Sequence, residues 1–503
     1  MKSIKYLIVI LTFLLVSSVE AATKTWTGTT STDWSVGSNW GGTAPVSGDD
    51  INIPTVVSGN YPVISTAVTL GGGTILINSN SGAGASLTIT TGGSLTMTGL
   101  ITVNANGTFT ISAGTASLAG ITSSGDINVD GGTITSTVDI TLSVSGATLD
   151  QTGGTIWMAT NTSTDPTDNL IITAGTVTQS GGTFYVKDYD NSPGTFNQTG
   201  SGALFQIFHD WKPGTGSTFN STAGTVQFKG SSGAGANFAA GSRQFKNIII
   251  DAGVDPGFDN SSSSAISISG DFTNNNTTLN KNTNATFTFN GIGVQAISSA
   301  STTNNATFGN LVIDNTGGTV SLSTNITAIA GTLTVKAGSV LALATFNFGS
   351  STGPSSLIME IGSTGASITG TTGTLTLGGN VTVNTTSGSS GVSISCPVTL
   401  GATRTFTVAD DGTSADDLTI SGVISGAFGV TKAGAGTMVQ PRRTRAFPTT
   451  HCPDRSSPRP KTSTTLPMER SVRRLKESGL ASRMSTLTGS RPFRPESAKT
   501  ARC

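Results

Sequence analysis

The sequence has few of the side chains that usually carry catalysis or cross-link a chain. Its 503 residues include three cysteines and two histidines, and only 11% are charged. Three cysteines are too few for a disulfide framework, and Cys396 stands alone in the body of the chain. Between residue 22 and Pro441 there is one histidine, His209, and one glutamate, Glu360. This scarcity argues against an ordinary mixed α/β enzyme.

The N-terminus has the pattern of a secretory signal peptide. Lys2 and Lys5 precede a short apolar run over residues 6–16, and small residues follow around Ala21. The run is about half of the ~20 apolar residues that a transmembrane helix needs. We therefore expect residues 1–22 to be removed on export, the protein to be secreted or displayed at the cell surface, and no membrane span in the mature chain.

The charge changes sign near residue 440. Residues 1–440 carry 12 basic and 23 acidic side chains, whereas residues 441–503 carry 15 and 4. The last 63 positions also contain 12 of the 14 arginines and 8 of the 17 prolines. We interpret residues 441–503 as a basic, disordered tail that is translated out of frame, so that the chain stops before an export or anchoring domain. The rival interpretation is a basic arm, but we expect no nucleic-acid partner.

The body of the chain has the sequence pattern of many short β-strands. From residue 23 to residue 440, Thr, Ser, Val, Ile and Leu alternate in short runs that Gly or Asn interrupts, as in residues 85–99 and 373–386. With 65 glycines available for sharp corners, this pattern predicts an all-β fold. We expect a right-handed parallel β-helix, or β-solenoid, over residues 61–440, in preference to a string of β-sandwiches.

A longer repeat lies inside this region. Three blocks recur in the same order about 62 residues later: 225–230 as 286–291, 244–251 as 307–314, and 266–273 as 327–334. We interpret them as a duplicated unit over residues 225–345. Phe228 and Phe289 should then hold equivalent positions, as should Ile249 and Val312.

Two segments resemble parts of known surface proteins. Residues 25–54, which contain three tryptophans, are similar to the opening module of many bacterial secreted, repeat-rich proteins, and we assign a capping module to residues 23–60. Residues 416–438 resemble the autotransporter-associated β-strand repeat through Ile420–Gly426 and Gly429–Thr437. This resemblance implies a β-helix displayed outside the cell, as in autotransporter passenger domains, which ordinarily precede a C-terminal β-barrel or sorting domain.

The residues indicate no catalytic set. Paired aspartates lie in Gly-, Asn- and Ser-rich turns, where their side chains ordinarily cap the backbone. The turn with Asp188, Asp190 and Asn191 has oxygen ligands at a spacing that suits Ca²⁺, but it lacks the bidentate glutamate of an EF-hand. We expect a local hydrogen bond between His209 and Asp210, and no cofactor.

Aromatic rings suggest a second kind of site. Trp26, Trp34, Trp40 and Trp211 are candidates for stacking on sugar rings, although a plug over the first coil explains the first three better. The resulting hypothesis is a non-enzymatic structural or adhesion protein whose partners are an extracellular polysaccharide or the surface of a host or neighbouring cell. The alternative is a polysaccharide lyase or hydrolase built on the same β-helix.

Overall fold

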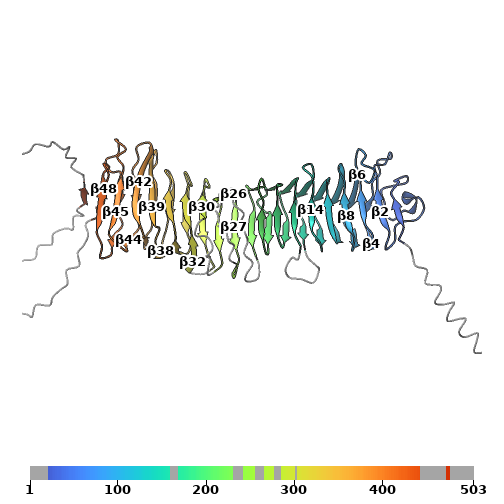
Figure 1. The fold of residues 1–503 in the computed structure, drawn as a ribbon, viewed down its shortest axis with the longest axis horizontal. Helices are drawn as coiled ribbons and strands as arrows, with labels where there is room; N and C mark the ends of the chain where they lie inside the picture. Colours follow the sequence, from blue (N-terminus) through green and yellow to red (C-terminus); the bar gives the residue numbers. More distant parts are fainter. Residues whose placement is uncertain are drawn as a thin grey trace, which may run out of the picture.

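The computed structural model describes residues 21–158, 168–229, 242–254, 265–276, 285–300, 303–441 and 472–475. These residues form a long rod of parallel strands, a β-solenoid of about 16 turns, with the N-terminal turn at one end and the C-terminal turns at the other (Figure 1). Apart from the 3-10 turn η1 (Gly37–Trp40), the described residues contain no helix. The all-β, parallel solenoid expected from the alternation is therefore confirmed.

Four sheets run along the rod, and we number them in the order in which the chain meets them. Sheet 1 contains β1 (Thr23–Thr25), β2 (Asp50–Ile53), β5 (Ile75–Ile77), β8 (Leu100–Val103), β11 (Gly120–Ser123), β14 (Ile140–Leu142), β17 (Leu170–Ile172), β20 (Tyr189–Asn191) and β23 (Trp211–Pro213). Sheet 2 contains β3 (Val63–Ile64), β6 (Ala85–Ile89), β9 (Gly107–Ile111), β12 (Asp126–Val129), β15 (Thr148–Gln151), β18 (Thr176–Gln179), β21 (Thr195–Gln198), β24 (Thr218–Ser221), β26 (Ser242–Phe245), β28 (Ala265–Ile268), β30 (Thr286–Phe289), β33 (Asn310–Ile313), β36 (Thr332–Val335), β39 (Ser356–Gly362), β42 (Asn380–Ser387), β45 (Arg404–Val408) and β48 (Val430–Ala433). Sheet 3 contains β4 (Ala67–Gly71), β7 (Ser94–Met97), β10 (Thr115–Leu118), β13 (Thr133–Ser136), β16 (Thr155–Trp157), β19 (Thr183–Val186), β22 (Leu204–Ile207), β25 (Thr225–Phe228), β27 (Asn247–Ile250), β29 (Phe272–Asn274), β31 (Val294–Ser298), β34 (Thr319–Leu322), β37 (Val340–Ala342), β40 (Ser367–Thr369), β43 (Val392–Ile394), β46 (Leu418–Ile420), β49 (Met438–Pro441) and β50 (Val472–Leu475). Sheet 4 contains β32 (Thr303–Phe308), β35 (Asn325–Ile329), β38 (Phe348–Thr352), β41 (Leu375–Leu377), β44 (Val398–Leu400) and β47 (Ile424–Ser425).

Each complete turn adds one strand to each of three sheets. A turn runs through sheets 1, 2 and 3 in the N-terminal half, and sheet 4 takes the place of sheet 1 in the chain order from β32 onward. Strands pair in register with the turns before and after, so that Ile127 lies between Phe109 and Leu149. Because alternate side chains of a strand point to opposite faces, this register collects the aliphatic residues into one continuous core, with all three of these side chains fully buried.

The corner between sheets 2 and 3 explains several of the recurrent glycines. Gly114, Gly132, Gly154 and Gly182 stand directly before successive strands of sheet 3, and each has a positive φ. An ideal Cβ on Gly154 would lie 2.4 Å from the carbonyl oxygen of Gly132 in the turn before. Only glycine therefore fits this stacked corner without displacing the neighbouring turn.

Both ends of the rod have an additional covering. Trp26, Trp34 and Trp40 are buried at the first turn, and their rings meet edge to face at centroid distances of 4.8 Å and 4.7 Å. At the other end, β49 pairs with β50, a short strand of the basic tail, in the antiparallel sense. The rest of the tail and residues 1–20 of the expected signal peptide lie outside the described residues. No helix within the described part of the chain is long and apolar enough to cross a membrane.

The matched sequence blocks do not fall on equivalent strands. Phe228 belongs to sheet 3 and Phe289 to sheet 2, and Ile249 and Val312 are separated in the same way. The prediction of equivalent positions is therefore wrong, although both phenylalanines face inward and both aliphatic residues are half-exposed. Successive turns here take 23 and then 21 residues, as the pairing of Ala265 with residues 242 and 286 shows, so a shift of about 62 residues is not a whole number of turns.

Candidate functional site

An unusual row of side chains lies on the outer face of sheet 3. The register places Thr135, Trp157, Tyr185, Gln206 and Gln227 side by side on successive strands, and we call these residues the outer row. The residues that precede them in each strand point inward and are fully buried. The core of these turns is therefore complete without the two aromatic residues of the outer row, which are half-buried.

Three rings form a compact group at this face, and of these Trp157 and Tyr185 are half-buried while Phe208 is buried. The ring centroids of Trp157 and Tyr185 are 4.4 Å apart, and Phe208, which follows β22, lies 6.4 Å and 6.5 Å from them. We call these three residues the aromatic cluster. The Lys229 ammonium is 5.9 Å from the centroid of the Phe208 ring, within cation–π range. The cluster thus combines apolar ring surface with a positive charge at its border.

Amide side chains continue the outer row beyond the cluster. The Gln206 amide donates to Gln227 at 2.6 Å, and the Gln227 amide donates to Asp251 at 2.8 Å. Gln206 is only 5% exposed, and its Oε1 has no hydrogen-bond partner. A buried carbonyl oxygen without a donor is costly, by about 1–3 kcal/mol, and the groups of this row that reach the surface are the half-buried Gln227 and Asp251.

A charged corner adjoins the cluster where the chain passes from sheet 3 to sheet 1. His209 Nδ1 lies 2.8 Å from an Asp188 carboxylate oxygen, which also accepts the Asp210 backbone N–H at 2.7 Å. The Lys187 ammonium is 3.6 Å from the other oxygen of Asp188. We call these four residues the His-Asp corner. Phe208 precedes His209 directly, so the corner and the aromatic cluster are continuous along the chain.

The three residues whose spacing suits Ca²⁺, Asp188, Asp190 and Asn191, do not converge. Asp190 is half-buried on β20, whereas Asn191 is fully buried and donates to the Tyr189 hydroxyl at 2.6 Å. Adjacent residues of a strand point to opposite faces, so Asp190 and Asn191 cannot share an ion. The structure brings Asp188 together with His209 instead, which sequence spacing did not predict.

The tryptophans proposed for sugar stacking lie inside the rod. Trp26, Trp34, Trp40 and Trp211 are between 0% and 5% exposed, so their ring faces are covered. Trp157, the remaining tryptophan, is the one on the outer face. The sequence carried a signal for it, because residues 153–157 (GGTIW) and 181–185 (GGTFY) place an aromatic residue at the same position after the corner glycines.

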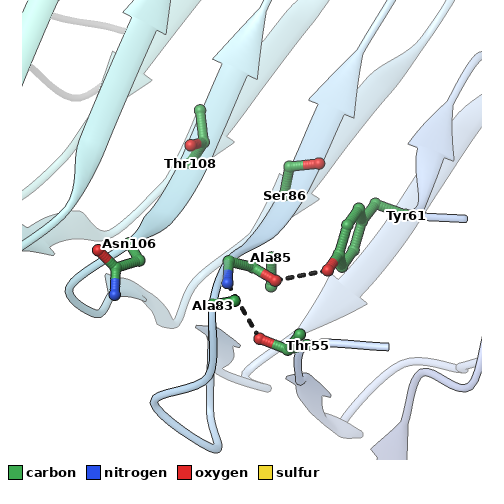
Figure 2. Close-up of a pocket in the computed structure, with 8 residues that line it drawn as sticks. Thr55, Tyr61, Ala83, Ala85, Ser86, Asn106 and Thr108 are labelled. Atoms are coloured by element: carbon green, nitrogen blue, oxygen red, sulfur yellow. Dashed lines mark hydrogen bonds between the residues drawn. The ribbon is translucent and has the colours of Figure 1, made fainter. Parts of the chain in front are cut away.

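Two other features are weaker candidates for a functional site. A hollow of about 320 Å³ near the N-terminal end is lined by residues that include Tyr61, Asn106 and Thr108 (Figure 2). It offers hydroxyl and amide groups but neither a carboxylate nor a cation. In the loop before β46, the pKa of Asp411 is lowered to about 2 because the Ser414 hydroxyl and nearby backbone N–H groups donate to its carboxylate. This carboxylate caps its own turn, as sequence reasoning expected for the paired aspartates.

Comparison with known proteins gives a match only for the N-terminal part of the chain. Residues 25–164 match the family model of a domain of unknown function (DUF8693), which spans the tryptophan-rich first turn and extends past Trp157. No curated protein and no solved structure matches the chain. The matched residues do not reach residues 416–438, so the likeness of that segment to the autotransporter repeat remains an expectation.

Proposed function

We propose that this chain is an exported β-solenoid of the cell surface or extracellular matrix, which acts by adhesion and display and not by catalysis. The observation that supports this most is the outer surface of the rod, where a stack of about 16 turns presents the same outward positions again and again. Repeated weak contacts along a stiff scaffold produce strong attachment through effective concentration, without any single deep pocket. The partners we propose are extracellular polysaccharide and the surface of a host or neighbouring cell.

The export step can be tested separately. We propose that residues 1–22 direct secretion, in line with the short apolar run and the flanking lysines. Arginine at Leu11 and Leu14 should interrupt that run and hold the protein inside the producing cell, while the unchanged chain is recovered from the medium or the cell surface. Equal intracellular retention of both proteins would remove the basis for an extracellular role.

Adhesion itself can be measured with beads that carry the full chain. Coated beads should be retained under flow on mucin, peptidoglycan or plant cell-wall polysaccharide, and retention should fall more than proportionally as the density of the chain on the bead is lowered. Albumin-coated beads are the control. Retention no greater than that of albumin beads on all three surfaces would contradict the adhesion proposal.

The His-Asp corner supports a second candidate, a polysaccharide hydrolase or lyase. Asp188, His209 and Asp210 offer ligand atoms within 4.8 Å of one another beside an aromatic surface, and two carboxyl groups are the usual minimum for glycoside hydrolysis. Against catalysis, Asp188 already accepts two hydrogen bonds from this corner. Release of reducing or unsaturated sugar that Asp188→Asn abolishes would favour the enzyme over the adhesin.

A further inference from the structure

We propose that the aromatic cluster, together with Gln206 and Gln227, is a polysaccharide-binding site on the outer face of sheet 3. This inference rests on the adhesion function proposed above and names the surface and the ligand class that would serve it. It concerns Trp157, Tyr185 and Phe208, which differ from the tryptophans that the sequence first suggested.

The first argument is that folding does not require the rings of Trp157 and Tyr185 on the outside, whereas Phe208 is itself only 8% exposed. Ile156 and Phe184 fill the core at the same levels of the rod and are fully buried. The corresponding outward position one turn earlier is Thr135, a small polar residue typical of this surface. Apolar rings gathered on an otherwise polar face are characteristic of an interaction surface, because water solvates them poorly.

The second argument concerns the kind of partner. Beyond Tyr185 in the outer row, Gln206 is buried and donates to Gln227, and Gln227 and its partner Asp251 are half-buried polar groups at the surface. A purely apolar partner would cover these polar groups without bonding to them, whereas a sugar brings both an apolar ring face and hydroxyl groups that can bond to Gln227 and Asp251. Binding sites that combine aromatic walls with a few fixed polar groups suit such amphipathic ligands.

The third argument is the shape of the surface. The outer row follows the long axis of the rod, and its strands are spaced at about 4.8 Å in a parallel sheet. Trp157, Tyr185, Gln206 and Gln227 therefore form a linear track across four turns. A linear track fits an extended chain of sugar units better than a compact small molecule.

The positive charge of Lys229 near the track should make the site bind acidic polysaccharides differently from neutral ones. In the described part of the chain, Lys229 has no carboxylate within ion-pair distance and lies over the Phe208 ring. By contrast, Lys187 already faces Asp188 at 3.6 Å. A uronic acid unit would gain from Lys229, so Lys229→Ala should weaken binding of an acidic chain and leave a neutral chain unaffected.

The test is affinity electrophoresis of the full chain in native gels that contain xylan, mixed-linkage β-glucan, soluble chitosan, alginate or polygalacturonate. At least one polysaccharide should retard the protein, and Trp157→Ala should weaken that retardation at least tenfold. Thr135→Ala, in the same row one turn away, is the matched control and should behave as the unchanged chain. Trp157→Tyr should restore part of the binding because it returns a ring.

Tryptophan fluorescence supplies a readout that does not depend on electrophoresis. Since the other four tryptophans are buried, quenching by acrylamide reports mainly on Trp157. The retarding polysaccharide should protect this fluorescence from acrylamide. Absence of retardation by all five polysaccharides, or retardation that Trp157→Ala leaves intact, would overturn the site. A Trp157-dependent dimer in sedimentation without any sugar binding would also overturn it, in favour of a second copy of the chain.

The bead assay separates failure of this site from failure of the adhesion function. Beads coated with the Trp157→Ala chain should lose retention on the polysaccharide surface that retards the unchanged protein. If these beads adhere as strongly as before, the adhesion function stands and the site proposed here is refuted.

Discussion

A buried ladder of glutamines gives the sharpest test of how this solenoid is held together. Gln151, Gln179 and Gln198 end three successive strands of sheet 2 and are fully buried. The side-chain amide of Gln179 donates to Oε1 of Gln151, and the side-chain amide of Gln198 donates to Oε1 of Gln179, each at 3.1 Å. Ser221 closes the ladder by donating to Gln198 at 2.7 Å. Each glutamine side chain therefore depends on its neighbour in the next turn for a hydrogen bond.

The perturbation is Gln179→Met, which keeps the length and approximate volume of the side chain. The change leaves the Gln151 oxygen without this donor and removes one acceptor from the Gln198 amide. Each buried polar group left unpaired costs about 1–3 kcal/mol, and a volume-conserving replacement adds less than about 1.5 kcal/mol. We therefore expect a loss of about 3 kcal/mol. Replacing all three glutamines with leucine should cost less than three such losses, because the amide-to-amide bonds are then removed from both partners at once, although Ser221 loses its Gln198 acceptor.

Hydrogen exchange is the appropriate assay, because long repeat arrays need not unfold in one step. A loss of about 3 kcal/mol should accelerate amide exchange in β18 and β21 by roughly 100-fold, while β42 and β45 exchange as before. The matched control is Gln244→Met, since Gln244 is a half-buried glutamine on β26 and should change stability by less than about 0.5 kcal/mol. Equal exchange in the two variants would refute the idea that the ladder stabilises these turns.

Three further predictions follow from burial and charge. Ile248→Ala should destabilise its turn by about 2–5 kcal/mol and Ile249→Ala by much less, as measured by local hydrogen exchange, because Ile248 is fully buried and Ile249 is half-exposed. Burial raises the pKa of Asp150, and neighbouring carboxylates add to this, so its ionised form opposes folding; Asp150→Asn should raise the thermal midpoint at pH 7 but not below pH 3.8, the ordinary pKa. Burial also raises the pKa of Cys396 to about 11, so iodoacetamide should leave its peptide unmodified in the native protein and alkylate it after denaturation, as mass spectrometry can show.

The presence of short strands was predictable from the sequence because it depends on the local alternation of apolar and polar residues. The runs around Leu87 and Phe109 place every second residue inward, and the structure buries these side chains fully. The turn and the sheet to which each strand belongs were not predictable, because the number of residues per turn varies. Each additional loop residue shifts all later strands along the sequence. This variation is why Phe228 and Phe289 match in sequence but lie in different sheets.

The candidate site was harder to predict for a related reason. Each of its residues is ordinary alone, and only the register between turns places Trp157 beside Tyr185 and brings His209 to Asp188. Counting tryptophans favoured the N-terminal group, which the structure buries at the end of the rod. Aligning the segments that follow the corner glycines would have placed Thr135, Trp157 and Tyr185 in one row, since a glycine stands directly before each of their three strands.

The glutamine ladder and the outer row are physically connected, and this connection yields a last prediction. The second amide proton of Gln179 goes to the carbonyl oxygen of Leu204, at the start of β22, and Gln198 donates likewise to Thr225, at the start of β25. The ladder inside sheet 2 thus fixes the strands that carry Gln206 and Gln227 on the outside. Gln179→Met should therefore weaken polysaccharide retardation and reduce the protection of Trp157 from acrylamide, although the changed residue never touches the ligand. Faster exchange in β18 with unchanged retardation would show that contacts within the aromatic cluster are sufficient to hold the site, and would refute the proposed connection.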